Sequence, residues 1–563
     1  MLRKEIIKEY VASLKEDGEL DYIFPLLLER MGYRLLSTPK QSKGQSQYGR
    51  DVVATNKVKG RPTLFLFELK GFRSHDITDR TLSEPDGLIE SLTASVNTPY
   101  RDASIPGLKD YDRRYVYVHN GTVDENARPT LDGFVERVFP DGNFERWDIN
   151  ILTDLFSKYL FEETLLTDED SYRLLKRTLV LLDSEGNDYA DIVQLVNLQI
   201  TRIESKKSTK RAKTNFFATI RLIGALVYYY SIQADNLYPA KYCMDTIVLK
   251  TWAWILRNKL EKKKKTLALF QPLVTLQLQV YEAYLNKVTN AAGFKEGFYS
   301  FRPSDTEYIF YPLRCYDFLG DLMYYFYAIE TFGIDKEGIE NHKAVVRDII
   351  MNNAGFKMPL LDTHSIPIQL VFLYLMHKPD KEDGMCMTSF VYETVANLIK
   401  RYQSKKMWPE LTGNRMALAK SLYEKSDDYC CESSLLIVVI FELISYMGLE
   451  PLYTRFREVV EESKVNLQIA YPVQDEHDIE QCLFEHRLYE ETSVQTDFKL
   501  PETLEELRLT YKKAYNSIRF RTDSAGFSYL KILAHIYYQT DLFPDFLGRA
   551  YCKNLETIEK NNK

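Results

Sequence analysis

The sequence has few of the residues from which disulfide scaffolds and zinc sites are built. It holds seven cysteines and eight histidines in 563 residues. No two cysteines stand at C-x-x-C spacing, and no histidine lies at zinc-ligand spacing from a cysteine or another histidine. An odd number of cysteines, together with an opening that has no apolar signal segment, predicts a reducing, cytoplasmic setting.

Long apolar runs are missing as well. The longest apolar stretch, residues 435–449, is shorter than the roughly 20 residues that a membrane span needs, and it contains Glu442. We therefore expect a buried helix there and no membrane association. The phosphate-loop pattern G-x-x-x-x-G-K-[ST] and a G-x-G-x-x-G after a strand are also lacking, so ATP-driven translocation would have to come from a partner.

The overall composition is that of an ordinary globular protein, with 45% apolar and 27% charged residues. Single hydrophobic cores stop growing near roughly 250–300 residues. The length of 563 residues therefore predicts two to four domains.

The most informative stretch, residues 48–70, places three charged residues on what should be two neighbouring strands. Apolar β-branched residues follow Asp51 directly, TLFLFELK at 63–70 is a bulky apolar run, and the GRP between them is typical of a turn. Because side chains alternate along a strand, Glu68 and Lys70 should share one face. Pairing of the two strands in a hairpin then brings Asp51 to the same end of the sheet.

This arrangement suits metal-dependent hydrolysis of phosphodiesters. Two carboxylates on one sheet edge fit a hard cation such as Mg²⁺, which takes oxygen ligands. A lysine beside them would orient or deprotonate a water and offset charge on a phosphate under attack. The alternative is a solvated strand end whose charges pair weakly.

The flanking segments complete a larger pattern. Residues 18–33 have apolar residues at helical spacing, with Glu19 in the first turn and Pro25 interrupting the helix. A strand at 33–37, a polar loop and the Gly-x-Asp of Gly49–Asp51 follow. This order of helix, strand, polar loop, Gly-x-Asp, turn and Glu-x-Lys resembles the restriction-endonuclease-like superfamily, the PD-(D/E)XK nucleases, and within it the Mrr-like enzymes. The resemblance covers about residues 15–160.

The resemblance implies a catalytic site and its cofactor. Glu19 matches the first-helix acid, Asp51 the metal-binding aspartate, and Glu68 with Lys70 the E-x-K pair. Asp51 and Glu68 would then bind Mg²⁺ or Mn²⁺. Many relatives carry Gln or Tyr on the helix after the E-x-K strand, whereas this chain has Glu90 and Ser91 there.

Two domains of different class are expected. Residues 1–163 should form an α/β domain, a mixed sheet flanked by helices, like the restriction endonucleases. From about 165 the alternating pattern gives way to segments of helical periodicity, such as residues 188–203, 215–232 and 527–539. Residues 164–563 are therefore predicted to be an all-α region, and no fixed repeat holds there for three copies.

Positive charge is concentrated in one segment of this helical region. Residues 201–265 contain fifteen Lys and Arg against four Asp and Glu, a net charge of +11 in a chain whose total is −7. The first cluster in this segment is predicted to bind nucleic acid through Lys206, Lys207, Lys210, Arg211 and Lys213. A second cluster lies at 262–265. The alternative is that both clusters are solvated helix ends.

The leading hypothesis is a Mg²⁺-dependent endonuclease, acting on DNA in bacterial restriction or anti-phage defence, with a helical region that senses, recruits or restrains it. The competing hypothesis is a nuclease fold without activity that binds nucleic acid or a partner protein. Assembly into a homo-oligomer through the helical region fits both hypotheses, although no heptad seam marks it.

Overall fold

A computed structural model describes residues 2–40, 48–71, 77–84, 87–184, 186–205, 209–300, 304, 306–333, 336–423, 428–472, 478–488, 493–514 and 520–540. The chain forms two compact units. Unit 1 consists of residues 1–247 and 268–276, and unit 2 of residues 248–267 and 277–563.

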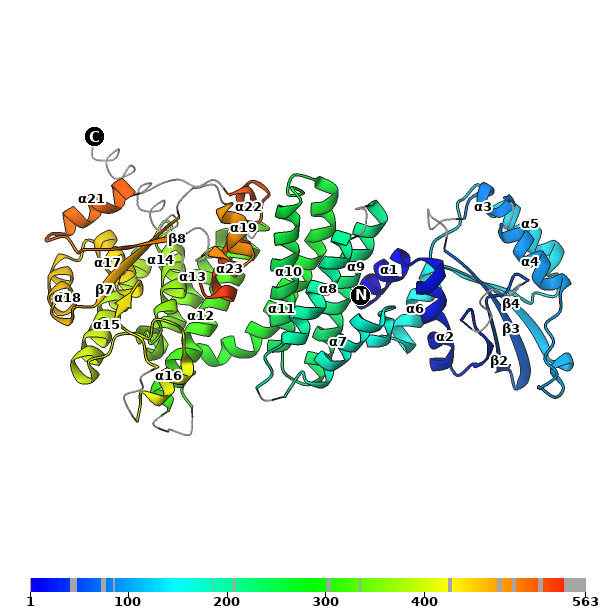
Figure 1. Ribbon diagram of the computed structural model, residues 1–563, viewed down its shortest axis with the longest axis horizontal. Helices are drawn as coiled ribbons and strands as arrows, with labels where there is room; N and C mark the ends of the chain where they lie inside the picture. The colour runs from blue at the N-terminus through cyan, green and yellow to red at the C-terminus, as the bar shows by residue number, and fades with distance from the viewer. Residues whose placement is uncertain are drawn as a thin grey trace. The chain divides into compact units, whose positions relative to one another are not determined.

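Unit 1 contains a five-stranded mixed sheet, as the sequence predicted (Figure 1). The strands lie in chain order and are β1 (Arg34–Ser37), β2 (Val52–Val58), β3 (Arg61–Lys70), β4 (Asp112–His119) and β5 (Phe144–Trp147). Neighbouring strands from β1 to β3 are antiparallel, whereas β3, β4 and β5 run parallel.

The hairpin of β2 and β3 is confirmed, but the prediction that GRP forms its turn is wrong. Val58 pairs with Arg61, so the turn consists of Lys59 and Gly60 alone, and both have positive φ angles, 49° and 82°. Such angles are those of a two-residue type I′ turn, whose twist matches that of the flanking strands. Arg61 and Pro62 instead begin β3.

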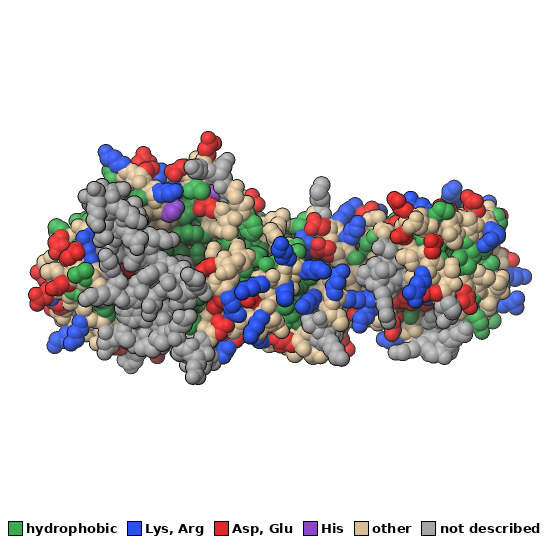
Figure 2. All heavy atoms as spheres, turned by 90° about the horizontal axis from the view of Figure 1, so that it is seen from above, with side chains coloured by type: hydrophobic (Ala, Val, Ile, Leu, Met, Phe, Trp, Pro, Cys, Tyr) green, Lys and Arg blue, Asp and Glu red, His purple; other side chains and the backbone are tan. Residues whose placement is uncertain are grey.

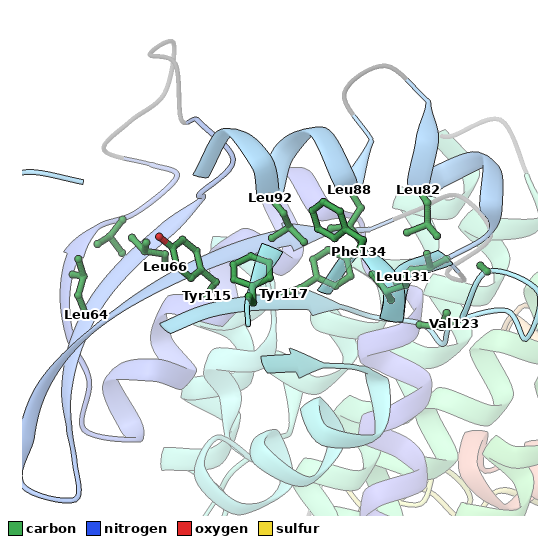
Figure 3. Close-up of a cluster of buried hydrophobic side chains, with 14 of the residues drawn as sticks. Leu64, Leu66, Leu82, Leu88, Leu92, Tyr115, Tyr117, Val123, Leu131 and Phe134 are labelled. Atoms are coloured by element: carbon green, nitrogen blue, oxygen red, sulfur yellow. The ribbon is translucent and has the colours of Figure 1, made fainter. Parts of the chain in front are cut away.

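Helices cover both faces of the sheet. On one face, Leu64 and Leu66 pack with Leu88 and Leu92 of α4 (Leu88–Asn97) and with α5 (Arg128–Val138) in one buried cluster (Figure 3). On the other face, the rings of Phe24 and Phe67 meet edge to face with centroids 5.3 Å apart. Phe24 belongs to α2 (Asp21–Arg30), which contains Pro25. The remaining elements near the sheet are α3 (Asp79–Ser83), η2 (Leu108–Asp110) and α6 (Ile149–Tyr159).

Unit 1 also contains helices before and after the five-stranded sheet in the sequence. A helix that we did not predict, α1 (Leu2–Ser13), precedes a π-helical turn, η1 (Glu16–Leu20). Arg221 is 4% exposed and its guanidinium bonds Glu5 and Glu9 of α1. The other helices are η3 (Glu163–Leu165), α7 (Glu169–Val180), α8 (Ala190–Ser205) and α9 (Lys210–Gln233). These ion pairs, in which only the arginine is buried, join α1 to α9.

The tyrosines of α9 take part in packing between helices. The ring of Tyr229 meets Phe161 edge to face at 5.5 Å, and the guanidinium of Arg3 lies 5.3 Å from its centroid. The hydroxyl of Tyr230 donates to Glu163. These contacts place Tyr229 and Tyr230 in the packing between helices.

Unit 2 is mainly helical, but the prediction of an all-α region is wrong. It holds a small sheet of β6 (Ser433–Ser434), β7 (Asn466–Pro472) and β8 (Ser493–Asp497). These strands have two to seven residues and lie between helices, too short to interrupt a pattern judged over longer windows.

Two helices, α10 (Tyr238–Arg257) and α11 (Lys264–Ala292), belong in part to each unit. The other helices of unit 2 are α12 (Glu307–Thr331), α13 (Lys336–Asn352), η4 (Ala354–Lys357), η5 (Asp362–His364), α14 (Ser365–Leu375), α15 (Lys381–Lys405), α16 (Arg415–Lys420), α17 (Leu436–Met447), α18 (Glu450–Ser463), α19 (Ile479–Phe484), α21 (Leu504–Ala514), α22 (Arg521–Ser524) and α23 (Tyr529–Tyr538).

The buried helix expected at residues 435–449 is confirmed as α17. Burial raises the pKa of Glu442 in this helix to about 8. Among the described residues, no helix combines the length and the apolar character that crossing a bilayer requires.

Candidate active site

Asp51 lies beside the carboxyl end of β3, as predicted. Its backbone N–H donates to the carbonyl of Phe67 at 2.8 Å, and its Oδ2 accepts the N–H of Leu69 at 2.7 Å. The aspartate is therefore fixed by backbone contacts on both sides of Glu68. These contacts orient one carboxylate oxygen toward β3.

Glu68 and Lys70 form an ion pair on β3. The Nζ of Lys70 is 3.1 Å from Oε1 of Glu68, and the Glu68 side chain is only 4% exposed. The alternative interpretation, a solvated strand end, is wrong for this glutamate. The hydroxyl of Ser91 on α4 adds a hydrogen bond to the Glu68 carboxylate. Ser91, at the position that the sequence singled out after the E-x-K strand, thus reaches the site.

Burial controls the protonation of the two carboxylates. Desolvation and the neighbouring Glu68 raise the pKa of Asp51 to about 8. Burial also raises the pKa of Glu68, although the ammonium of Lys70 opposes that shift. For Lys70, burial lowers the pKa, but the attraction of Glu68, Glu16 and Asp51 outweighs it and leaves the pKa raised. With Asp51 and Glu68 both ionised, the cluster would hold more negative charge than its one lysine can offset.

The first-helix acid is placed differently from the prediction. The Oε2 of Glu19 accepts the backbone N–H of Lys15 at 2.7 Å, and no described contact joins Glu19 to Asp51, Glu68 or Lys70. Glu16 takes that place instead. Its Oε1 is 3.9 Å from Nζ of Lys70, and its Oε2 accepts the N–H of Gly71 at 2.8 Å.

The cause of this shift is a break in the helix. Sequence periodicity extended one helix from residue 18 onward, which would put Glu19 in its first turn. In the structure, Asp17 (ψ 123°) and Gly18 (φ 77°) have non-helical angles within η1, and the regular helix α2 begins only at Asp21, after Glu19. A glycine before the apolar stripe was the signal that could have shown the break.

Gly49, two residues before Asp51, packs directly on α4. Its φ of +69° is one that side chains disfavour, and a Cβ there would lie 1.8 Å from the carbonyl oxygen of Ser91. This close approach sets the distance between the Asp51 segment and the helix that carries Ser91. The glycine of the Gly-x-Asp motif is thus required by packing.

Substitution of Gly49 by alanine should therefore destabilise the protein by about 3 kcal/mol or more, because strain of roughly 1–3 kcal/mol adds to a clash with backbone that cannot turn aside. Gly60→Ala is the matched control: its φ is +82°, but a Cβ there meets nothing within 4 Å. Urea unfolding of both variants measures the difference. Equal losses of stability in the two variants would contradict the packing role of Gly49.

The donor set fits a hard divalent cation. Asp51 and Glu68 are neighbouring carboxylates whose negative charge is disfavoured by burial. Mg²⁺ is commonly held by one or two carboxylates with waters completing its shell. Within the described residues, no group of three or more His, Cys, Asp or Glu is arranged to hold a metal. Among the described residues, Asp51 and Glu68 are therefore the two carboxylates that would hold the cation.

The five residues predicted to bind nucleic acid differ in their exposure and contacts. Lys206 and Lys207 lie outside the described residues. Lys210 is exposed in the first turn of α9, and Lys213 is half-buried. Arg211 is held in a packing contact, because its guanidinium donates to the carbonyl of Leu14 at 2.8 Å. Contacts of Arg211 and of the lysines with phosphates stay predictions.

Comparisons of the chain with protein-family models, with curated proteins and with solved structures found no match. The function of the site is therefore argued from its geometry.

Proposed function

We propose that the chain is a Mg²⁺- or Mn²⁺-dependent endonuclease with a restriction-endonuclease-like domain, acting on DNA. The observation that supports this most is the convergence of Asp51, Glu68 and Lys70 at the end of two paired strands. The mixed sheet with helices on both faces supports it as well. The role in bacterial restriction or anti-phage defence is the one that the resemblance implies.

In this proposal Asp51 and Glu68 hold the metal. When bound, the cation would acidify a water and stabilise charge on the phosphate. Asp51 can bind the cation because the N–H of Leu69 occupies only its Oδ2, which leaves Oδ1 for a ligand. Ser91 orients the carboxylate of Glu68 from α4.

Lys70 acts as a donor. Its raised pKa keeps the ammonium protonated at neutral pH, so the proposal of orienting a water is favoured over that of deprotonating it. The ammonium would stabilise charge that develops on the phosphate. Glu16 positions this lysine and also holds the N–H of Gly71, directly after β3.

The competing proposal is a nuclease fold that binds nucleic acid without cutting it. It draws on the ion pair between Lys70 and Glu68 and on the lack, within the described residues, of a group of three or more His, Cys, Asp or Glu that could hold a metal. Incubation of the protein with plasmid DNA and with RNA, in Mg²⁺, in Mn²⁺ and in EDTA, separates the two. Metal-dependent nicking of the plasmid supports the nuclease, and cleavage that survives EDTA contradicts it.

DNA affinity should come largely from the lysines near the start of α9. Around the five-stranded sheet, the described acidic and basic side chains on the surface visible in Figure 2 are interspersed, without a basic patch for DNA. Replacing Lys206, Lys207, Lys210 and Lys213 with glutamine should make log affinity less dependent on log salt, by about 0.9 for each lost phosphate contact on duplex DNA. Fluorescence anisotropy over a salt series measures the slope.

Arg211 is left unchanged in this variant because its guanidinium donates to the carbonyl of Leu14, directly after α1. The same change at Lys262, Lys263, Lys264 and Lys265 tests the second basic cluster separately. An unaltered slope and affinity in the first variant would mean that its lysines are a solvated helix end.

A further inference from the structure

Unit 1 encloses a second polar site, a cavity of about 270 Å³ beside α1, α8 and α9. Its lining includes Tyr10, Glu19, Gln199, Arg202, Asn215 and Phe216. None of these residues belongs to the Asp51, Glu68 and Lys70 cluster. The volume suits a ligand the size of a small metabolite.

The charges of the lining leave an excess of one carboxylate. Asp168 and Arg202 pair with each other at 2.5 Å, so their charges cancel. The other acid of the lining is Glu19, whose described hydrogen bond is to the neutral N–H of Lys15. The residues that line the cavity therefore carry a net charge of one negative, which favours a cation over a phosphate or carboxylate.

Hydrogen-bond acceptors accompany this charge. Gln199 is 6% exposed and uses its Nε2 on the hydroxyl of Ser171 at 2.6 Å. Asn215 uses its Nδ2 on the hydroxyl of Ser13 at 3.2 Å. Among the described contacts, neither amide oxygen accepts a bond. Together with Glu19 they offer acceptors for an ammonium group, which has three donors and no acceptor.

We propose that this cavity binds a small primary amine, with its ammonium at Glu19 and its carbon body against Phe216. Burial of an apolar body beside a charge-assisted hydrogen bond supplies both affinity and orientation. The proposal does not depend on nuclease activity, because it rests on the cavity alone.

Occupancy of the cavity bears on the candidate active site through η1. Glu19 and Glu16 lie three residues apart in this turn, and Glu16 bonds Gly71 and pairs with Lys70. The turn packs closely on β3, since a Cβ on Gly71 would lie 2.8 Å from the nitrogen of Glu16. A ligand that fixes Glu19 therefore restrains the residue that positions Lys70.

Isothermal titration calorimetry on the full chain tests the site with butylamine and benzylamine, and with 1-butanol and benzyl alcohol as neutral counterparts. We expect the amines to bind and the alcohols to bind at least about tenfold more weakly, the equivalent of one charged hydrogen bond. Glu19→Gln keeps an acceptor for Lys15 and should weaken amine binding to the same extent. Ala212→Leu, which fills the cavity without changing its charge, should abolish binding.

Glu136→Gln is the matched control, since this glutamate is exposed on α5, and it should bind as the parent does. Failure of both amines to bind, or equal binding by Glu19→Gln and the parent, overturns the site.

Hydrogen–deuterium exchange tests the connection between the cavity and Lys70 through η1. Benzylamine should slow exchange in peptides covering residues 15–20 and 68–71. Binding without such protection overturns the proposed connection through η1.

Discussion

Glu68→Gln should lower the rate of Mg²⁺-dependent plasmid cleavage by about 10³-fold. The substitution removes one of the two carboxylates proposed to hold the metal, and loss of one electrostatic group at such a site typically costs 10²–10³-fold in rate. Glutamine has nearly the same shape, so it fills the buried space that Glu68 occupies at 3% exposure. Initial rates of nicking across a Mg²⁺ series measure the effect.

Two further variants, Lys70→Ala and the control Glu136→Gln, belong to this experiment. Lys70→Ala should also cut poorly, because the ammonium 3.1 Å from Glu68 is lost. Glu136→Gln makes the same chemical change as Glu68→Gln on the exposed face of α5 and should cut like the parent. If Lys70→Ala cleaves DNA as fast as the parent, the role proposed for this lysine is wrong.

Asp51→Asn should make the metal-free protein more stable at pH 8, by an amount on the order of a few kcal/mol. The pKa of Asp51 is raised from 3.8 to about 8 in the folded protein. Between these two values the folded state holds a proton that the unfolded state releases, so the stability of the parent falls as pH rises through this window. Asparagine cannot ionise, and its side-chain oxygen can still accept the N–H of Leu69.

Urea unfolding in EDTA at pH 4, 6 and 8 measures this effect. The two proteins should differ little at pH 4, and their difference should grow toward pH 8. Mg²⁺ added at pH 8 should then stabilise the parent more than Asp51→Asn, because a bound cation offsets the ionised carboxylate. A constant difference at every pH would contradict the raised pKa, and equal stabilisation by Mg²⁺ would place the metal elsewhere.

Much of the sheet could be predicted because its signals are local. The apolar run of β3 and the β-branched start of β2 identified the hairpin, and the alternation of side chains put Glu68 and Lys70 on one face. The burial of the site residues could not be predicted, because it depends on tertiary packing. Burial of Glu68 depends on α4, which comes twenty residues later in the chain and contributes Ser91.

Two site residues have contacts that the sequence did not indicate, and both cases have physical causes. Assignment of the first-helix acid to Glu19 depended on where one helix begins, and the left-handed Gly18 moves that boundary. The assignment of Arg211 to phosphate binding depended on its charge alone, whereas the structure shows a contact with Leu14, far away in sequence. Residues joined by such distant contacts leave no periodic signal in the chain.

The division of α10 and α11 between the units affects how the protein can be cut into fragments. Unit 1 is discontinuous, since it includes residues 268–276 as well as 1–247. Phe270, Leu273 and Val274 within that short return segment are fully buried. A gene fragment that stops at residue 163 or 247 would omit these side chains and leave their apolar neighbours open to water. Expression of unit 1 by itself therefore requires that residues 268–276 of α11 be joined to it, by a graft or by circular permutation.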